Sequence, residues 1–194
     1  RPHLESGQSL RDVDLPQADE RLVRSFAFLS LKPLLHFINL DEADLGHIDS
    51  PGPRFAVDKP GRRAMAFCGK IESEIAECDE AERPEFMAGY GLREPSAARF
   101  FAQAVPFLDR ITFFTVGKDE VRAWTVPRAS TAVRAAGAIH TDIEKGFIRA
   151  EVIATDDLLR LGSLQHAKDA GAIRLEGKDY VVRDGDVIYF RFAP

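Results

Sequence analysis

Two loops in the first half of the sequence carry polar groups that could bind a small ligand. Asn39-Leu40-Asp41-Glu42 follows the apolar run 34–38, which has the length and composition of a strand buried on both faces. Cys68-Gly69-Lys70 follows a second short apolar run, 64–67. Open α/β sheets bind their ligands at the carboxyl ends of parallel strands. We therefore expect the two loops to close over one site.

The chemistry of these loops suits a nucleobase. GTP-binding proteins carry Asn-Lys-x-Asp after the corresponding strand, and the Asp carboxylate accepts hydrogen bonds from N1–H and N2–H₂ of guanine. Here Leu40 and Glu42 replace that Lys and Asp, which weakens the fit to guanine. Adenine offers an N6 donor and an N1 acceptor, so Asn39 and the backbone at Leu40 could serve it, with the Leu40 side chain over the ring. The predicted base-binding residues are Asn39, Leu40, Glu42, Cys68, Gly69 and Lys70.

A purely structural alternative exists for the first loop, namely a turn after a strand in which Asn39 satisfies backbone groups. The phosphate end of a nucleotide site is missing in either case. A phosphate-binding loop ends in Gly-Lys-Ser/Thr, whereas Gly69-Lys70-Ile71, Gly117-Lys118-Asp119 and Gly177-Lys178-Asp179 lack the hydroxyl and the spacing. The Asp-x-x-Gly segment that follows such a loop and binds the metal is missing with it. We expect no catalytic residue, no metal site and no hydrolysis from this chain alone.

The elements around these loops predict an incomplete doubly wound domain. Apolar residues recur at helical spacing from Gln17 to about Ser30, and helices are expected at about 71–81 and between Pro84 and Leu108. Two strands with their loops are fewer than the five or six of a complete sheet of this type. Residues 1–108 are therefore predicted to be the C-terminal remnant of an α/β nucleotide-binding domain.

Residues 109–194 have a different character, with short β segments separated by turn signals. Strands are expected at 111–116, 120–126, 147–153, 178–182 and 187–192, with a helix at 131–140 and a short helix at 156–161. The first two strands form a predicted hairpin around Gly117-Lys118-Asp119. This order predicts a small α+β domain of the β-grasp, ubiquitin-like type.

Several long runs resemble the C-terminal half of the Obg-like ATPase (YchF-type) family. They are 24–42, 80–87, 91–95, 113–125, 135–142, 145–151, 176–180 and 184–186, and together they span nearly the whole chain from about residue 20. The resemblance implies a translation-factor-class P-loop NTPase that prefers ATP, associates with ribosomes and ends in a TGS domain. It places Asn39, Leu40 and Glu42 on the family's altered base-specificity motif, and the helix before Phe26 at the end of its helical arm. ATP and Mg²⁺ are implied only for a full-length parent.

Charge and composition restrict the partners. The net charge is −5, and the 13 acidic and 13 basic side chains of 109–194 cancel, so any RNA contact must come from a local patch. We predict such a strip from Arg122, Lys145 and Arg149 with His140; alternatively, these side chains only solubilise the sheet and pair with neighbouring carboxylates. No apolar run is long enough for a membrane helix, and Cys68 and Cys78 are expected to be reduced. A cytoplasmic protein without membrane contact or DNA sequence recognition is expected.

Two functions follow from these observations. The first is the C-terminal portion of a ribosome-associated, ATP-preferring nucleotide-binding protein whose TGS domain binds RNA or the ribosome. The alternative is a stand-alone interaction module that contains a TGS domain and neither binds nor hydrolyses nucleotide.

Overall fold

The structure is a computed structural model that describes residues 2–51, 59, 61–117 and 120–193. It divides into two compact units, Arg1–Ala104 and Val105–Pro194, with the division inside helix α6. Residues 52–58 and 60 of the predicted surface loop, and Lys118 and Asp119 of the predicted hairpin turn, lie outside the described residues. None of the described helices is long and apolar enough to span a bilayer.

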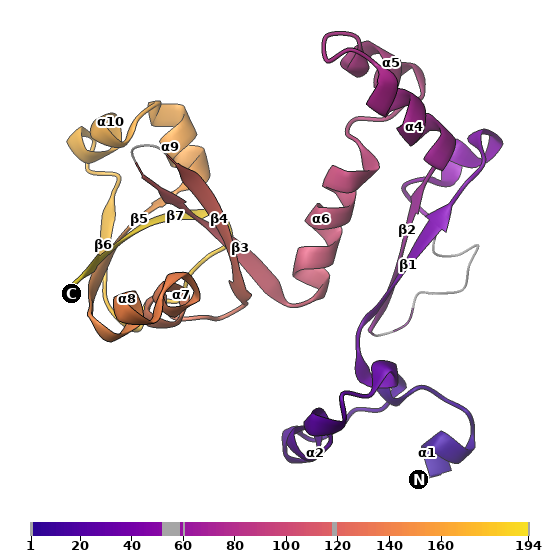
Figure 1. The fold of residues 1–194 in the computed structure, drawn as a ribbon, viewed down its shortest axis with the longest axis horizontal. Coiled ribbons are helices and arrows are strands. Elements are labelled where there is room, and N and C mark those ends of the chain that lie inside the picture. The colour runs from indigo at the N-terminus through magenta and orange to yellow at the C-terminus, as the bar shows by residue number, and fades with distance from the viewer. Residues whose placement is uncertain (1, 52–58, 60, 118–119, 194) are drawn as a thin grey trace. The chain divides into compact units, whose positions relative to one another are not determined.

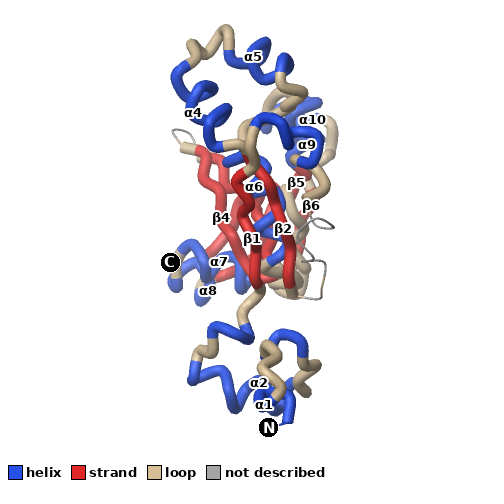
Figure 2. The backbone as a smooth tube through the Cα atoms, turned by 90° about the vertical axis from the view of Figure 1, so that its right-hand side faces the viewer, coloured by secondary structure: helices blue, strands red, loops and turns tan. Residues whose placement is uncertain are grey.

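The first unit contains a parallel pair of strands. β1 (Leu34–Asn39) and β2 (Arg62–Phe67) pair in register from Leu34 opposite Arg62 to Asn39 opposite Phe67. Both predicted strands are therefore present, and β2 begins two residues earlier than expected. Figures 1 and 2 show α1 and α2 at the amino ends of these strands and α4 and α5 at their carboxyl ends.

Helices and 3₁₀ turns make up most of the remainder of the first unit. The helices are α1 (Pro2–Glu5), α2 (Gln17–Val23), α4 (Gly69–Glu77), α5 (Arg83–Gly89) and the larger part of α6 (Ser96–Phe107), and the 3₁₀ turns are Leu10–Asp12, Arg24–Phe26, Leu29–Leu31 and Glu42–His47. The helix predicted for 17–30 was wrong beyond Val23. Leu22, Phe26 and Leu29 are 74%, 68% and 76% exposed, so the apolar stripe has no core to pack against. Ala27 then adopts a left-handed conformation (φ 51°) that ends the helical path.

The second unit is a five-stranded mixed sheet with helices on both faces. Its strands are β3 (Arg110–Val116), β4 (Val121–Pro127), β5 (Phe147–Ala154), β6 (Arg174–Glu176) and β7 (Asp186–Phe192). They are ordered β4-β3-β7-β5-β6, with β3 and β7 parallel and every other pair antiparallel. Its helices are α7 (Ala132–Ile139), α8 (Thr141–Lys145), α9 (Thr155–Leu161) and α10 (Leu164–Asp169).

Two clusters hold the helices of the second unit to the sheet. Ala132, Ala135 and Ala136 of α7 pack on Phe113, Ile188 and Phe190 in the larger cluster. Ala167 of α10 packs on Ile153 and Val187 on the opposite face, with Leu158 and Leu161 of α9 beside them. Figure 1 shows α7 and α8 on one side of the sheet and α9 and α10 on the other. Alternate residues of the central strands therefore face two different helical layers.

Most predicted elements of the second unit are present, with one strand displaced. The helix expected at 131–140 is α7, whose N-terminus is capped by Thr131 accepting from the Arg134 N–H. The strand predicted at 178–182 was wrong, because β6 lies at Arg174–Glu176 and only Val181 forms an isolated bridge, to Thr131. The Tyr180 N–H bonds back to the Gly177 carbonyl, so 177–180 forms a turn instead of continuing the ladder.

Candidate functional site

The two loops predicted to form one site meet at the carboxyl ends of β1 and β2. Oδ1 of Asn39 accepts a hydrogen bond of 2.8 Å from the Gly69 N–H, the first residue of α4. The Leu40 N–H donates to the Phe67 carbonyl at 2.7 Å and continues the parallel ladder by one step. Asn39 therefore takes the place of an N-cap side chain for α4, because Cys68 at the cap position makes no such bond.

Gly69 permits the close approach of the two loops. A Cβ atom at this position would lie 3.3 Å from Oδ1 and 3.5 Å from Nδ2 of Asn39. Asn39 itself is exposed. Because a carbonyl oxygen has two lone pairs and the amide nitrogen two donors, Asn39 keeps hydrogen-bonding capacity after it has bonded to Gly69.

An ion pair joins the same loops on the solvent side. Lys70 Nζ contacts Glu42 Oε1, and the two side chains are 68% and 37% exposed. The hydrogen bond and charge of Glu42 raise the pKa of Lys70 above its ordinary value. Glu42 begins the 3₁₀ turn 42–47, where the Asp41 carboxylate accepts from the Glu42 N–H.

Leu40 and Cys68 are placed differently from the other four predicted site residues. They are only 6% and 3% exposed and belong to the core cluster with Ile48, Ala66 and Ile71. The Leu40 side chain therefore lies in the core, and not over the loop where the sequence argument placed it against a base. At the carboxyl edge of the strand pair, only the backbone of Leu40 could contact a ligand.

The basic residues predicted in the second unit occupy separate places. Arg122 of β4 bonds to Glu120 at 2.6 Å, and its guanidinium carbon lies 5.9 Å from the Trp124 ring centroid. His140 caps α8, where Nδ1 accepts from the Asp142 N–H at 3.2 Å, and Lys145 is the exposed last residue of that helix. Arg149 is exposed on β5.

Strand register puts Arg122 and Arg149 on opposite faces of the sheet. Arg122 pairs with Thr115, and Trp124, two residues further along β4, pairs with Phe113. Because residues two apart in a strand share a face, Arg122 lies on the α7 face with Phe113. Arg149 pairs with Arg191 of β7. Arg191 lies on the same face of β7 as Val187, which packs against α10, so Arg149 lies on the α10 face. The structure therefore does not gather the four predicted residues into one strip, and their role in binding RNA stays a prediction.

The α10 face carries exposed residues that are not among the predicted site residues. A groove of about 1040 Å³ includes Tyr189 and Arg191 of β7, Glu151 of β5, and Leu164 and Lys168 of α10 in its lining. Tyr189 is 63% exposed on the middle strand of the sheet. The alternation of Val187, Tyr189 and Arg191 with buried Ile188 and Phe190 is the sequence signal that could have found this face.

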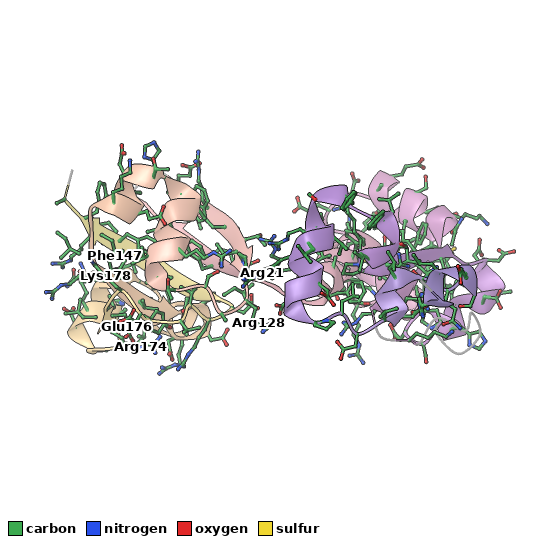
Figure 3. All side chains as sticks on the ribbon, turned by 90° about the horizontal axis from the view of Figure 1, so that it is seen from below. Arg21, Arg128, Phe147, Arg174, Glu176 and Lys178 are labelled. Carbon is green, nitrogen blue, oxygen red and sulfur yellow. The ribbon has the colours of Figure 1, made fainter. Side chains whose placement is uncertain are left out.

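A buried carboxylate at the start of β7 has a structural explanation. Asp186 is 2% exposed and accepts from the Tyr180 hydroxyl at 2.7 Å and the Arg183 N–H at 2.9 Å. Burial and the bond to Asp186 raise the pKa of Tyr180. Arg174, which with Glu176 is labelled in Figure 3, lies 3.7 Å from Asp186 and 3.8 Å from Glu176. This network anchors the 177–185 segment to the sheet.

The described residues contain no cluster of three or more His, Cys, Asp or Glu side chains suited to a metal ion.

Comparisons with known proteins agree on one family. Residues 110–193 match a family model named YchF-GTPase_C and described as "Protein of unknown function (DUF933)". The chain is 44% identical over 194 residues to the ribosome-binding ATPase YchF of Pasteurella multocida, covering 98% of this chain and 53% of that protein. It is 40% identical over 193 residues to the protein of that name from Bacillus subtilis, with 97% and 53% covered. The chain thus spans about half the length of the curated relatives it matches.

A solved structure gives the same result. The Schizosaccharomyces pombe YchF GTPase superposes with a TM-score of 0.80 at 28% identity, covering 96% of this chain and 50% of that one. A GTP-binding protein from Pyrococcus horikoshii superposes with a TM-score of 0.56 at 17% identity and supports the fold alone.

Proposed function

We propose, from the premise that this chain belongs to the YchF-type family, that it is the C-terminal portion of a ribosome-associated nucleotide-binding protein that prefers ATP to GTP. The observation that carries this proposal is the junction of Asn39 with Gly69 at the carboxyl edge of a parallel strand pair. It brings the base-reading loop and the second loop together at the edge where open α/β sheets bind ligands. Ribosome association would place the protein in the cytoplasm.

The ion pair of the site supports a preference for adenine. Guanine recognition by this kind of loop needs a carboxylate free to accept from two guanine donors, and Glu42 is already paired with Lys70. Adenine needs one donor and one acceptor, which the remaining capacity of the exposed Asn39 amide supplies. A guanine would compete with Lys70 for the Glu42 carboxylate, whereas an adenine would not need that carboxylate.

The phosphates and Mg²⁺ of a nucleotide do not fit this chain. None of the predicted site residues has the Gly-Lys-Ser/Thr arrangement that holds them, and the described residues contain no metal cluster. ATP and Mg²⁺ are therefore proposed only for a longer parent. The chain 1–194 should show no ATP hydrolysis above a buffer blank at any Mg²⁺ concentration, and a rate that rises with protein concentration through successive purification steps would contradict this.

We further propose that the second unit is a TGS-type β-grasp module that binds RNA or the ribosome. Its sheet order, with a parallel central pair and α7 packed across one face, supports the β-grasp assignment. The names of the relatives support a ribosomal partner. The predicted contact residues Arg122, His140 and Lys145 would act from the α7 side, and Arg149 from the other.

Nucleobase binding by the intact chain 1–194 tests the proposal against its alternative, an interaction module that binds no nucleotide. Titration with millimolar adenosine, followed in ¹H–¹⁵N NMR spectra, should shift the Asn39 side-chain amide and the Gly69 backbone amide. Guanosine at the same concentration should shift them less. Absence of any shift with adenosine, together with retained pelleting with ribosomes, would favour the interaction module.

A further inference from the structure

One sheet face in the second unit carries a groove lined by exposed strand residues. α9 and α10 cover the end of this face around Ile153 and Val187. Beyond them the groove runs between Lys168 of α10 and the residues Tyr189 and Arg191 of β7. The face is therefore built from regular strands, with a helix along one rim.

Tyr189 has an exposed aromatic ring on the middle strand of the sheet. It lies on the central strand β7, opposite Glu151 of β5, and is 63% exposed. Its neighbours Ile188 and Phe190 point into the core and are 1% and 7% exposed. The ring is thus held on a rigid strand while remaining open to solvent, which is the arrangement that lets a nucleobase stack on a protein surface.

Three cationic side chains, Arg149, Arg191 and Lys168, lie on the same face of the sheet as this ring. Arg149 and Arg191 are direct cross-strand partners, and like charges opposite each other destabilise a sheet. Arg191 pairs with Glu151, the one carboxylate among the groove-lining residues that the structure describes. Within the part of the chain that the structure describes, neither Arg149 nor Lys168 has an ion-pair partner, and each is exposed. The two arginines and Lys168 exceed Glu151 by two positive charges.

We propose that a single-stranded segment of RNA docks on this face, with one base stacked on Tyr189 and its phosphates beside Arg149, Arg191 and Lys168. The inference rests on the proposed ribosome association and names the surface that would carry it. A single strand is favoured over a duplex because only unpaired bases offer a free ring face. The charge surplus favours it over an apolar protein segment.

The test uses the chain 1–194 with fluorescein-labelled 20-nucleotide oligouridylate in anisotropy titrations. Tyr189→Ala should weaken binding about 5- to 150-fold, the range for loss of one base stack. Tyr189→Phe keeps the ring and should retain the wild-type affinity. Equal affinity of the Ala and wild-type proteins, or equal loss in the Ala and Phe variants, overturns the stacking role.

The phosphate contacts have their own test. Arg149→Ala with Lys168→Ala leaves the Glu151–Arg191 pair intact. The plot of log affinity against log salt should become less steep by about 1.4, because each phosphate contact on a single strand contributes about 0.7 to its slope. Arg134→Ala with Lys178→Ala removes the same charge outside the groove and is the matched control. A slope that falls equally in both variants shows non-specific attraction and overturns the assignment.

Ribosome co-sedimentation separates this inference from the proposed function. If the wild type does not pellet with ribosomes, the proposed function fails. If the wild type pellets and Tyr189→Ala pellets equally, only the docking face is wrong. If Tyr189→Ala reduces pelleting while oligouridylate does not bind the wild type, the face contacts a ribosomal protein and the RNA inference is overturned.

Discussion

Each unit contains a β-sheet, but the two sheets are enclosed very differently. In the second unit, Phe113, Val152 and Ile188 are at most 2% exposed beneath α7. In the first unit, Phe37 of β1 is 46% exposed and Phe101 of α6 is 65% exposed. Parallel strands are normally covered on both faces, so the two-stranded sheet of the first unit is incompletely enclosed. The second unit therefore has the packing of an independent domain, whereas the first combines a partial core, the cluster around Ile71, with contacts between loops such as that of Asn39 with Gly69.

The largest expected effect contrasts these cores. Phe113→Ala should lower the free energy of unfolding of the second unit by about 3–5 kcal/mol, the usual cost of removing a fully buried aromatic ring. Phe101→Ala, at a 65% exposed site, should cost less than about 1 kcal/mol. Trp124, the single tryptophan, lies in β4 and reports urea unfolding of the second unit, whereas hydrogen exchange of the β1 and β2 amides reports the first. Equal losses of stability, each measured in the unit that carries the substitution, would remove the contrast between the units.

The second effect concerns the base-reading loop of the first unit. Leu40→Lys with Glu42→Asp restores the guanine pattern and should shift the adenosine-to-guanosine affinity ratio towards guanosine by about 1–3 kcal/mol, the scale of hydrogen bonds made by a charged group. Because the Leu40 side chain is buried, Glu42→Asp alone, which leaves the core intact, is tested beside it and should shift the ratio in the same direction. NMR titration of chain 1–194 with each nucleoside measures the ratio. Lys178→Ala in the second unit is the control. An unchanged ratio in the double variant would mean that these residues do not read the base.

The third effect tests the local contact that supports the first unit. Asn39→Ala removes the acceptor for the Gly69 N–H and should destabilise the start of α4 by about 1 kcal/mol, as loss of a capping side chain does. Asn39→Asp retains an acceptor and should preserve most of that stability. Hydrogen exchange of the α4 amides measures the effect, and α7, capped by Thr131, is the internal reference. Faster exchange in α7 as well would show a global effect instead of a lost cap.

The difference between the units also explains what the sequence could predict. The strands at 34–38 and 64–67 could be predicted because each is an apolar run that ends in a polar turn. Parallel strands align their carboxyl ends, so the meeting of the two loops could be predicted as well. The helix from Gln17 could not be bounded in this way, because its apolar stripe faces solvent. Burial of Leu40 depends on core neighbours from four other segments, which periodicity does not reveal.

In the second unit, the strands were predictable and their faces were not. A basic residue's face depends on which strand pairs with which, and in what register. Arg122 and Arg149 both alternate with apolar residues in the sequence, yet the order β4-β3-β7-β5 places them on opposite sides. The displacement of β6 to 174–176 likewise reflects tertiary bonds, since Tyr180 is held by Asp186 and 177–180 closes as a turn.

The smallest expected effect is a change of pKa with salt, which should differ between Lys70 in the first unit and Tyr180 in the second. The pKa of Tyr180 is raised first by burial, and that of Lys70 by the exposed Glu42 pair. Salt screens exposed charges and leaves burial unchanged, so 1 M NaCl should return the Lys70 pKa towards its ordinary value and leave Tyr180 raised. Because the folded pKa of Tyr180 exceeds that of the unfolded chain, the stability it contributes is present below about pH 10 and is lost as pH rises through the folded pKa. Phenolate absorbance at 295 nm, with Tyr180→Phe subtracted, follows the first group, and ¹³C NMR of the lysine Cε follows the second. A Tyr180 pKa that falls with salt as far as that of Lys70 would show that charge, and not burial, sets both.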